Sequence, residues 1–83
     1  LDHYQTYYAD RACLCDYQVT PGSHVEAGDT LAELAIHSSS GESIITPLKA
    51  HAGGIVVNHA STSNLQAGSE IFQILEKPEK YTD

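Results

Sequence analysis

Apolar and polar residues alternate along most of this chain in short stretches, and a turn signal ends each stretch. The predicted strand segments are residues 12–19, 31–36, 44–45, 55–57 and 69–75, of which 44–45 and 55–57 are short apolar runs. The turn signals between them are Pro21-Gly22, Gly28-Asp29, the serine-rich segment 38–42, Gly53-Gly54 and the polar segment 58–64. No segment keeps a helical period. Short strands with turn signals about every 8 to 12 residues predict an all-β sandwich or barrel.

The same pattern predicts the position of one strand and the limits of the domain. Ile44 and Ile45 begin a strand that Pro47 interrupts, so this strand is expected at a sheet edge or a bulge, where no ladder N–H is needed. Residues 1–11 show no clean period and are predicted to be a connector, with a tyrosine packing back on the body. Residues 77–83 are charged and contain proline, which is typical of a tail. The β domain is therefore expected to cover residues 12–76.

One segment of the pattern occurs twice. Val25–Leu34 can be laid on Leu65–Ile74, 40 residues further along, with apolar residues at the first, seventh and tenth positions and Ala-Gly at the third and fourth. In each copy an apolar residue enters the core, a glycine reverses the chain, and an alternating strand follows. Neither half can bury its apolar face alone. The repeat predicts two equivalent halves that share one core about a pseudo-twofold axis.

Composition restricts the classes of function. The chain has 83 residues, 11 acidic against 4 basic, and a net charge of −7. This length predicts a single domain, and the charge argues against nucleic acid as a partner, since phosphate binding needs clustered Lys and Arg. No apolar run approaches the roughly 18 residues that span a bilayer, so no membrane partner is expected. The sequence starts at Leu1 and contains no Met, which we interpret as a piece of a longer chain.

The two cysteines, Cys13 and Cys15, are i and i+2 neighbours on the same face of the predicted strand. Their Cα atoms would be about 7 Å apart, at the limit for a disulfide. A Cys-x-x-Cys metal pattern is absent. We interpret them as small apolar residues facing the core of a cytoplasmic protein.

Three of these segments together resemble the biotinyl/lipoyl-like domain. Pro21–Leu31 fits the family pattern Gly-Asp-x-Val-x-x-Gly-Asp-x-Leu. Ala50–Val56 fits Ala-Pro-x-x-Gly-x-Val with His51 in place of Pro, and Leu65–Ile71 supplies the second apolar-x-x-Gly-x-x-apolar element. The resemblance covers about residues 12–75. It implies a barrel-sandwich hybrid, or flattened β-barrel, with the turns at Gly22, Gly28, Asp29, Gly54 and Gly68.

Carrier domains of this type attach biotin or lipoate to a lysine at a hairpin tip, seven residues before the Ala of Ala-Pro. That position is Ser43 here, and the nearest lysine, Lys49, is at the far end of the strand. A carrier role is therefore disfavoured, and no cofactor is expected in this segment.

The chain also resembles the C-terminal domain of the succinylglutamate desuccinylase/aspartoacylase family of zinc hydrolases. The segment from Leu31 to Ala50 is longer, and that from Gly54 to Gly68 shorter, than in biotin carriers. The resemblance implies a non-catalytic accessory domain that packs on its own catalytic domain, upstream of Leu1, and shapes substrate access or oligomerisation. Zinc would belong to that catalytic domain. The alternative is a structural module of a membrane-fusion adaptor, in which a long helical hairpin occupies this loop, although about a dozen residues are too few for one.

Residues that could carry chemistry are present without a catalytic pattern. The five histidines show no His-Glu-x-x-His spacing, the turn carboxylates Glu26 and Asp29 are expected to be solvated, and no serine lies in a Gly-x-Ser-x-Gly frame. We predict no catalytic and no metal-binding residue here. We expect interaction instead through two loops, comprising Ser38, Ser39, Ser40, Gly41 and Glu42 in one, and Ser61, Thr62 and Asn64 in the other.

Overall fold

In the computed structural model, which describes residues 3–76, every regular element is a β-strand. This confirms the all-β class predicted from the alternation of apolar and polar residues. The strands are β1 (Tyr4–Tyr8), β2 (Cys13–Tyr17), β3 (His24–Val25), β4 (Thr30–His37), β5 (Ser43–Lys49), β6 (Gly54–His59), β7 (Asn64–Leu65) and β8 (Glu70–Glu76).

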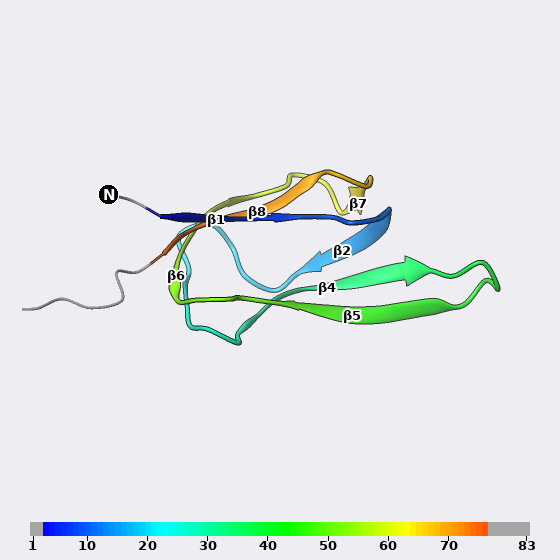
Figure 1. The fold of residues 1–83 in the computed structure, drawn as a ribbon, viewed down its shortest axis with the longest axis horizontal. Helices are drawn as coiled ribbons and strands as arrows, with labels where there is room; N and C mark the ends of the chain where they lie inside the picture. Colours follow the sequence, from blue (N-terminus) through cyan, green and yellow to red (C-terminus); the bar gives the residue numbers. More distant parts are fainter. Residues whose placement is uncertain (1–2, 77–83) are drawn as a thin grey trace, which may run out of the picture.

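The strands form two four-stranded antiparallel sheets, with the orders β1-β8-β6-β3 and β5-β4-β2-β7. The sheets pack face to face as a sandwich (Figure 1). They do not close into a barrel, because no ladder joins an edge strand of one sheet to an edge strand of the other within the described residues. Of the two architectures expected, the sandwich therefore forms. Pro47 lies in the edge strand β5, as predicted.

The two sheets have corresponding strand orders. β1, β8, β6 and β3 of one sheet occupy the same places as β5, β4, β2 and β7 of the other. The two Ala-Gly turns also correspond. Gly28 and Gly68 have φ of 91° and 88°, and their amides donate to the carbonyls of Ala50 (2.8 Å) and Ala9 (2.7 Å). A φ of this sign is the third-position conformation of a type II turn, which glycine adopts without strain. These equivalences support the predicted internal repeat.

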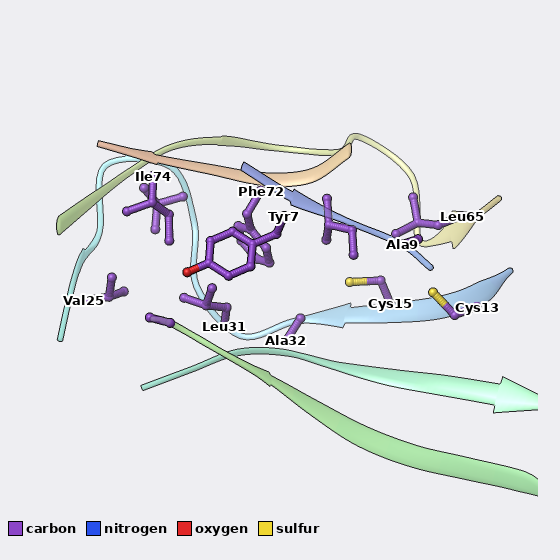
Figure 2. Packing of buried hydrophobic residues seen from close by; sticks show 13 residues of the cluster. Tyr7, Ala9, Cys13, Cys15, Val25, Leu31, Ala32, Leu65, Phe72 and Ile74 are labelled. Carbon is purple, nitrogen blue, oxygen red and sulfur yellow. The ribbon is translucent and has the colours of Figure 1, made fainter. Parts of the chain in front are cut away.

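The core lies between the sheets and follows the alternation of each strand. On β2 the side chains of Cys13 and Cys15 are buried while Leu14 and Asp16 face outward. Val25 and Leu65, the apolar residues that precede the two Ala-Gly turns, are both buried, as the repeat predicts. Figure 2 shows the cluster. Its members are Tyr7, Ala9, Cys13, Cys15, Val25, Leu31, Ala32, Ala50, Val56, Leu65, Ile71, Phe72 and Ile74.

The structure corrects the sequence analysis at the N-terminal end. Residues 4–8, inside the predicted connector 1–11, form β1 and pair with β8. Three tyrosines with Gln5 and Thr6 give no alternation of apolar and polar residues, so the sequence of this strand has no clear period. The ladder also shifts register between Tyr7 and Tyr8. The expectation that a tyrosine packs on the body is confirmed, because Tyr7 is buried. The predicted tail, 77–83, lies outside the described residues.

Candidate interaction surface

The hairpin of β4 and β5 projects past the ends of β2 and β7 (Figure 1). Its loop, Ser38–Glu42, closes through the amide of Ser38, which donates to the carbonyl of Glu42 at 2.8 Å. Gly41 adopts a φ of 91°, and its amide donates to the carbonyl of Ser38 at 3.0 Å. The predicted interaction loop is therefore a defined turn at the end of a long ribbon.

The ribbon below this loop exposes large apolar side chains on both faces. Ile44 is 52% exposed and Ile45 is 58% exposed. Ile45 pairs with Ala35, which pairs with Leu14, so these three form a row on the outer face, because paired residues share a face. Ile44 pairs with Ile36 on the inner face, where Ile36 is only partly buried. These uncovered apolar side chains make the ribbon a candidate site of protein contact.

Ser43, the position of the carrier lysine in the biotinyl/lipoyl resemblance, is the first residue of β5. Its Oγ lies 3.3 Å from Nδ1 of His37, its cross-strand partner. Both side chains are exposed. Lys49 is the last residue of the same strand, so its amine is at the opposite end of β5 from the loop.

The second predicted interaction loop, residues 58–64, lies against β2 rather than beside the hairpin tip (Figure 1). The carbonyl of Thr62 accepts from the hydroxyl of Tyr17 at 2.7 Å, and the carbonyl of Ser63 accepts from the amide of Cys15 at 2.7 Å. Ser61, Thr62 and Asn64 are exposed. The structure therefore keeps the two predicted loops apart, and they do not form one surface.

The predicted turn residues fall into two kinds. Gly22, Gly28 and Gly68 have positive φ, and Asp29 accepts a hydrogen bond from the amide of Glu26 at 2.8 Å through its Oδ2. Gly54 is different, because it is a buried residue at the start of β6 and not a turn. A Cβ there would collide with the carbonyl oxygen of Leu75. Close approach of β8 is what requires glycine at this position.

The histidines lie on different elements, and no group of three His, Cys, Asp or Glu among residues 3–76 could hold a metal ion. His59 stacks on Tyr17, with ring centroids 4.1 Å apart and planes 13° apart, and both rings meet Phe72 edge-on. His51 lies beside Tyr7, at 5.1 Å between ring centroids. These two imidazoles pack against aromatic rings of the body.

The thiols sit in an environment that keeps them protonated. Burial raises the pKa of Cys15 from its usual 9.0 to about 11, against a smaller opposite effect of its hydrogen bond with Tyr17. Burial also raises the pKa of Cys13. Both cysteines are free and buried. A protonated thiol is a poor nucleophile and metal ligand, so this pair has the packing role predicted from its position on one face of the strand.

A small hollow of about 190 Å³ lies at the opposite end of the molecule from the hairpin tip. It is lined by His24, Val25, Glu26, Gly54, Ile55, Leu75 and Glu76. Its lining is mainly apolar, and its volume is below that of typical small-molecule sites. The exposed hairpin is therefore the stronger candidate for a functional surface.

Comparison with known proteins finds solved structures of similar fold. No protein-family model matches the sequence, and no curated protein matches it. Solved structures do match. A succinylglutamate desuccinylase/aspartoacylase family protein of Shewanella amazonensis aligns with a TM-score of 0.73 at 18% identity, over 93% of this chain and 23% of that one.

Two further structures give the same result. A succinylglutamate desuccinylase/aspartoacylase of Shewanella frigidimarina has a TM-score of 0.73, 17% identity, and coverage of 88% of this chain and 20% of its own. The ectoine utilization protein EutE (DoeB) of Ruegeria pomeroyi has a TM-score of 0.73 at 17% identity, with coverage of 87% and 22%. The chain thus has the fold of a small part of such proteins and spans less than a quarter of their length.

Sequence reasoning identified the hairpin loop but missed the apolar ribbon below it. Ile44 and Ile45 were expected only as the start of a strand, while the structure leaves both exposed. Pro47 was the available signal. It predicted that this apolar strand lies at a sheet edge, where the backbone groups along one side have no partner strand. Leu14, exposed on β2 in the same row as Ile45, has no such signal in the sequence.

Proposed function

We propose that this chain is a non-catalytic accessory domain of a larger protein of the succinylglutamate desuccinylase/aspartoacylase type. One observation carries the proposal: the same sandwich covers most of this chain and only 20–23% of each of three matching proteins. Such a domain would follow the catalytic part of the chain in the cytoplasm, and zinc would be held by that part. The corresponding turns also support a biotinyl/lipoyl-like origin for the fold.

The role of the domain would be to pack on the catalytic part and shape access to it. The apolar ribbon of β4 and β5 supports this role, since it presents uncovered side chains at one end of the sandwich. The adaptor alternative expects a long helical hairpin between these strands. Here the connection is the five-residue loop Ser38–Glu42, and residues 3–76 contain no helix long and apolar enough to cross a membrane.

The test is an activity assay of the purified 83-residue chain with N-acyl amino acids and added zinc. The chain should fold, as judged by circular dichroism, and release no amino acid. Turnover above the rate of a zinc-only control would contradict an accessory role.

A second measurement separates this proposal from a carrier function. The chain is incubated with biotin ligase or lipoate ligase and its intact mass is recorded. The mass should not change, because Ser43 has no amine. A gain of one biotinyl or lipoyl group on the chain would contradict the proposal.

A further inference from the structure

Within residues 3–76, no strand pairs with the outer edge of β5. The positions of its outward-facing backbone groups follow from the hydrogen bonds around the strand. The carbonyl of Glu42 accepts from the amide of Ser38, and the amide of Ala50 donates to the carbonyl of Asp29 at 2.9 Å. Both ends of β5 therefore direct even-numbered residues toward β4. Because consecutive residues of a strand direct their backbone groups to opposite sides, Ser43, Ile45 and Pro47 direct theirs away from the sheet.

The half of this edge next to the hairpin loop has little protection against pairing. Natural edges are blunted by charged side chains, proline, bulges or covering elements. Residues 43–47 read Ser-Ile-Ile-Thr-Pro and carry no charge in a chain of net charge −7. All five are exposed. The two protective residues of β5, Pro47 and the exposed Lys49, both lie at its end away from the loop, so only the N–H of Pro47 is missing among the outward-facing residues 43, 45 and 47.

We propose that two copies of this chain pair antiparallel through these edges, with Ile45 of one copy opposite Ile45 of the other. Each Ile45 would exchange both backbone hydrogen bonds with its counterpart. The amide of Ser43 would donate to the carbonyl of Pro47 of the second copy, and the same bond would form at the other end. The missing N–H of Pro47 then falls at the rim of the pairing, where water reaches the carbonyl it leaves unpaired.

Side chains on both faces favour a second copy as the occupant of this edge. On the outer face the row of Leu14, Ala35 and Ile45 would continue into the same row of the second copy, with two β-branched residues at its centre. On the inner face Thr46 would meet Ile44 of the second copy.

The distribution of charge also favours contact between two copies through residues 43–47. Two copies with a net charge of −7 repel each other over most of their surfaces, and residues 43–47 form an uncharged segment along which they can approach. A twofold pairing uses up both β5 edges, so the contact closes at a dimer. The pairing uses the backbone edge of β5, whereas the proposed packing on a catalytic part uses the side-chain faces of the same ribbon, so the pairing does not depend on the proposed function.

Sedimentation equilibrium of the 83-residue chain tests the pairing, across about 10 μM to about 1 mM, a range suited to a small interface. We expect a reversible monomer–dimer equilibrium. A chain that stays monomeric throughout, or that forms species larger than dimers, would overturn the proposal.

Two substitutions at the centre and one matched control identify the edge. Ile45→Pro removes an outward-facing N–H while leaving the bonds to β4 in place, and Ile45→Lys puts two like charges on the axis. Each should weaken the dimer at least about tenfold, as expected for a lost bond pair or for facing like charges. Val57→Lys adds the same charge at a residue 40% exposed on β6 and should leave the dimer unchanged. A dimer that survives both changes at Ile45, or that is lost in Val57→Lys, contradicts the assignment.

Amide hydrogen exchange locates the contact without any substitution. Within the part of the chain that the structure describes, Ser43 and Ile45 donate to no strand. Their amides should therefore exchange freely at low concentration and at least about tenfold more slowly where the dimer forms. Circular dichroism confirms that each variant is folded. Amides of Ser43 and Ile45 that exchange equally fast at both concentrations, while a dimer is present, would place the interface elsewhere.

Discussion

Strands β1 and β5 hold the same place in the two sheets, yet they relate to the core in different ways. Each is an edge strand that pairs with the strand following an Ala-Gly turn: β1 pairs with β8, and β5 pairs with β4. On β1, Tyr7 is 5% exposed and its hydroxyl accepts from the amide of His51 at 2.9 Å. On β5 no residue is buried. One edge completes the core, and the other is left open.

The difference follows from where each strand lies along the sandwich. The half of β5 near Lys49 lies close to the body, with Leu48 partly buried against the core. The half near Ser43 extends beyond the opposite sheet, as the projecting hairpin in Figure 1 shows. Equivalent topology therefore does not give equivalent burial. The uncovered half is the part of the molecule that is free to make contacts.

The largest expected effect is the loss of the aromatic ring that β1 places in the core. Tyr7→Ala should lower the free energy of unfolding by about 3 to 4 kcal/mol, because it removes a buried ring and leaves a cavity. On the open edge, Ile45→Ala should change stability by no more than about 0.5 kcal/mol. Urea unfolding measured at low protein concentration checks both. Similar losses for the two variants would remove the contrast between the edges.

Glycine substitutions sharpen the same contrast in a different way. Gly54→Ala should cost about 2 kcal/mol, because the new methyl group overlaps the backbone of β8 and the strands must separate. Gly41→Ala, at the hairpin tip, should cost about 1 kcal/mol. There the methyl group meets open space, and the cost comes from the positive φ alone. A larger loss at Gly41 than at Gly54 in thermal unfolding would contradict this account of the two glycines.

Alkaline pH should lower the free energy of unfolding through two ionisable side chains of β2. Burial raises the pKa of Tyr17 from 10.0 to about 12 and that of Cys15 from 9.0 to about 11. A raised pKa means that the folded chain keeps protons that the unfolded chain has released, so stability falls as pH rises from about 9 to about 12. Urea midpoints across this range should show the decline. A Cys15→Ala/Tyr17→Phe double variant should decline less, and an equal decline would show that other groups are responsible.

The smallest expected effects compare one hydroxyl on each edge. Tyr7→Phe removes an acceptor of the His51 amide and should cost about 1 kcal/mol. Ser43→Ala removes an exposed contact with His37 and should change stability by less than about 0.5 kcal/mol. Differential scanning calorimetry of the pair measures both changes. A greater loss for Ser43→Ala would mean that the hairpin tip is more tightly held than its exposure indicates.

Local chemistry made most of the fold predictable. The Ala-Gly turns, the alternation on β2 and β4, and the edge position of Pro47 each depend on residues close together in the sequence. The sequence analysis missed β1, because its tyrosines alternate in burial without alternating in polarity. The short strands β3 and β7 were also missed, since two residues leave no period to detect.

The candidate surface was less predictable, because it depends on what fails to cover a strand. The loop Ser38–Glu42 could be recognised from its composition. The exposure of both Ile44 and Ile45 could not. Adjacent residues of a strand point to opposite faces, so the sequence implied that one of them faces the core. Which strands extend beyond the opposite sheet depends on the relative lengths and register of segments far apart in the chain.

Amide hydrogen exchange of the dilute chain tests the contrast between the two edges most directly. The amides of Gln5 and Tyr7 face β8, because these residues lie two and four positions after His3, whose carbonyl accepts from the amide of Glu76 at 2.8 Å. They should exchange only when the whole chain unfolds, as should the amides of β8. Ile44, which faces β4, should exchange through local opening of lower free energy. Equal protection of Ile44 and Tyr7, or faster exchange at Tyr7, would contradict the account.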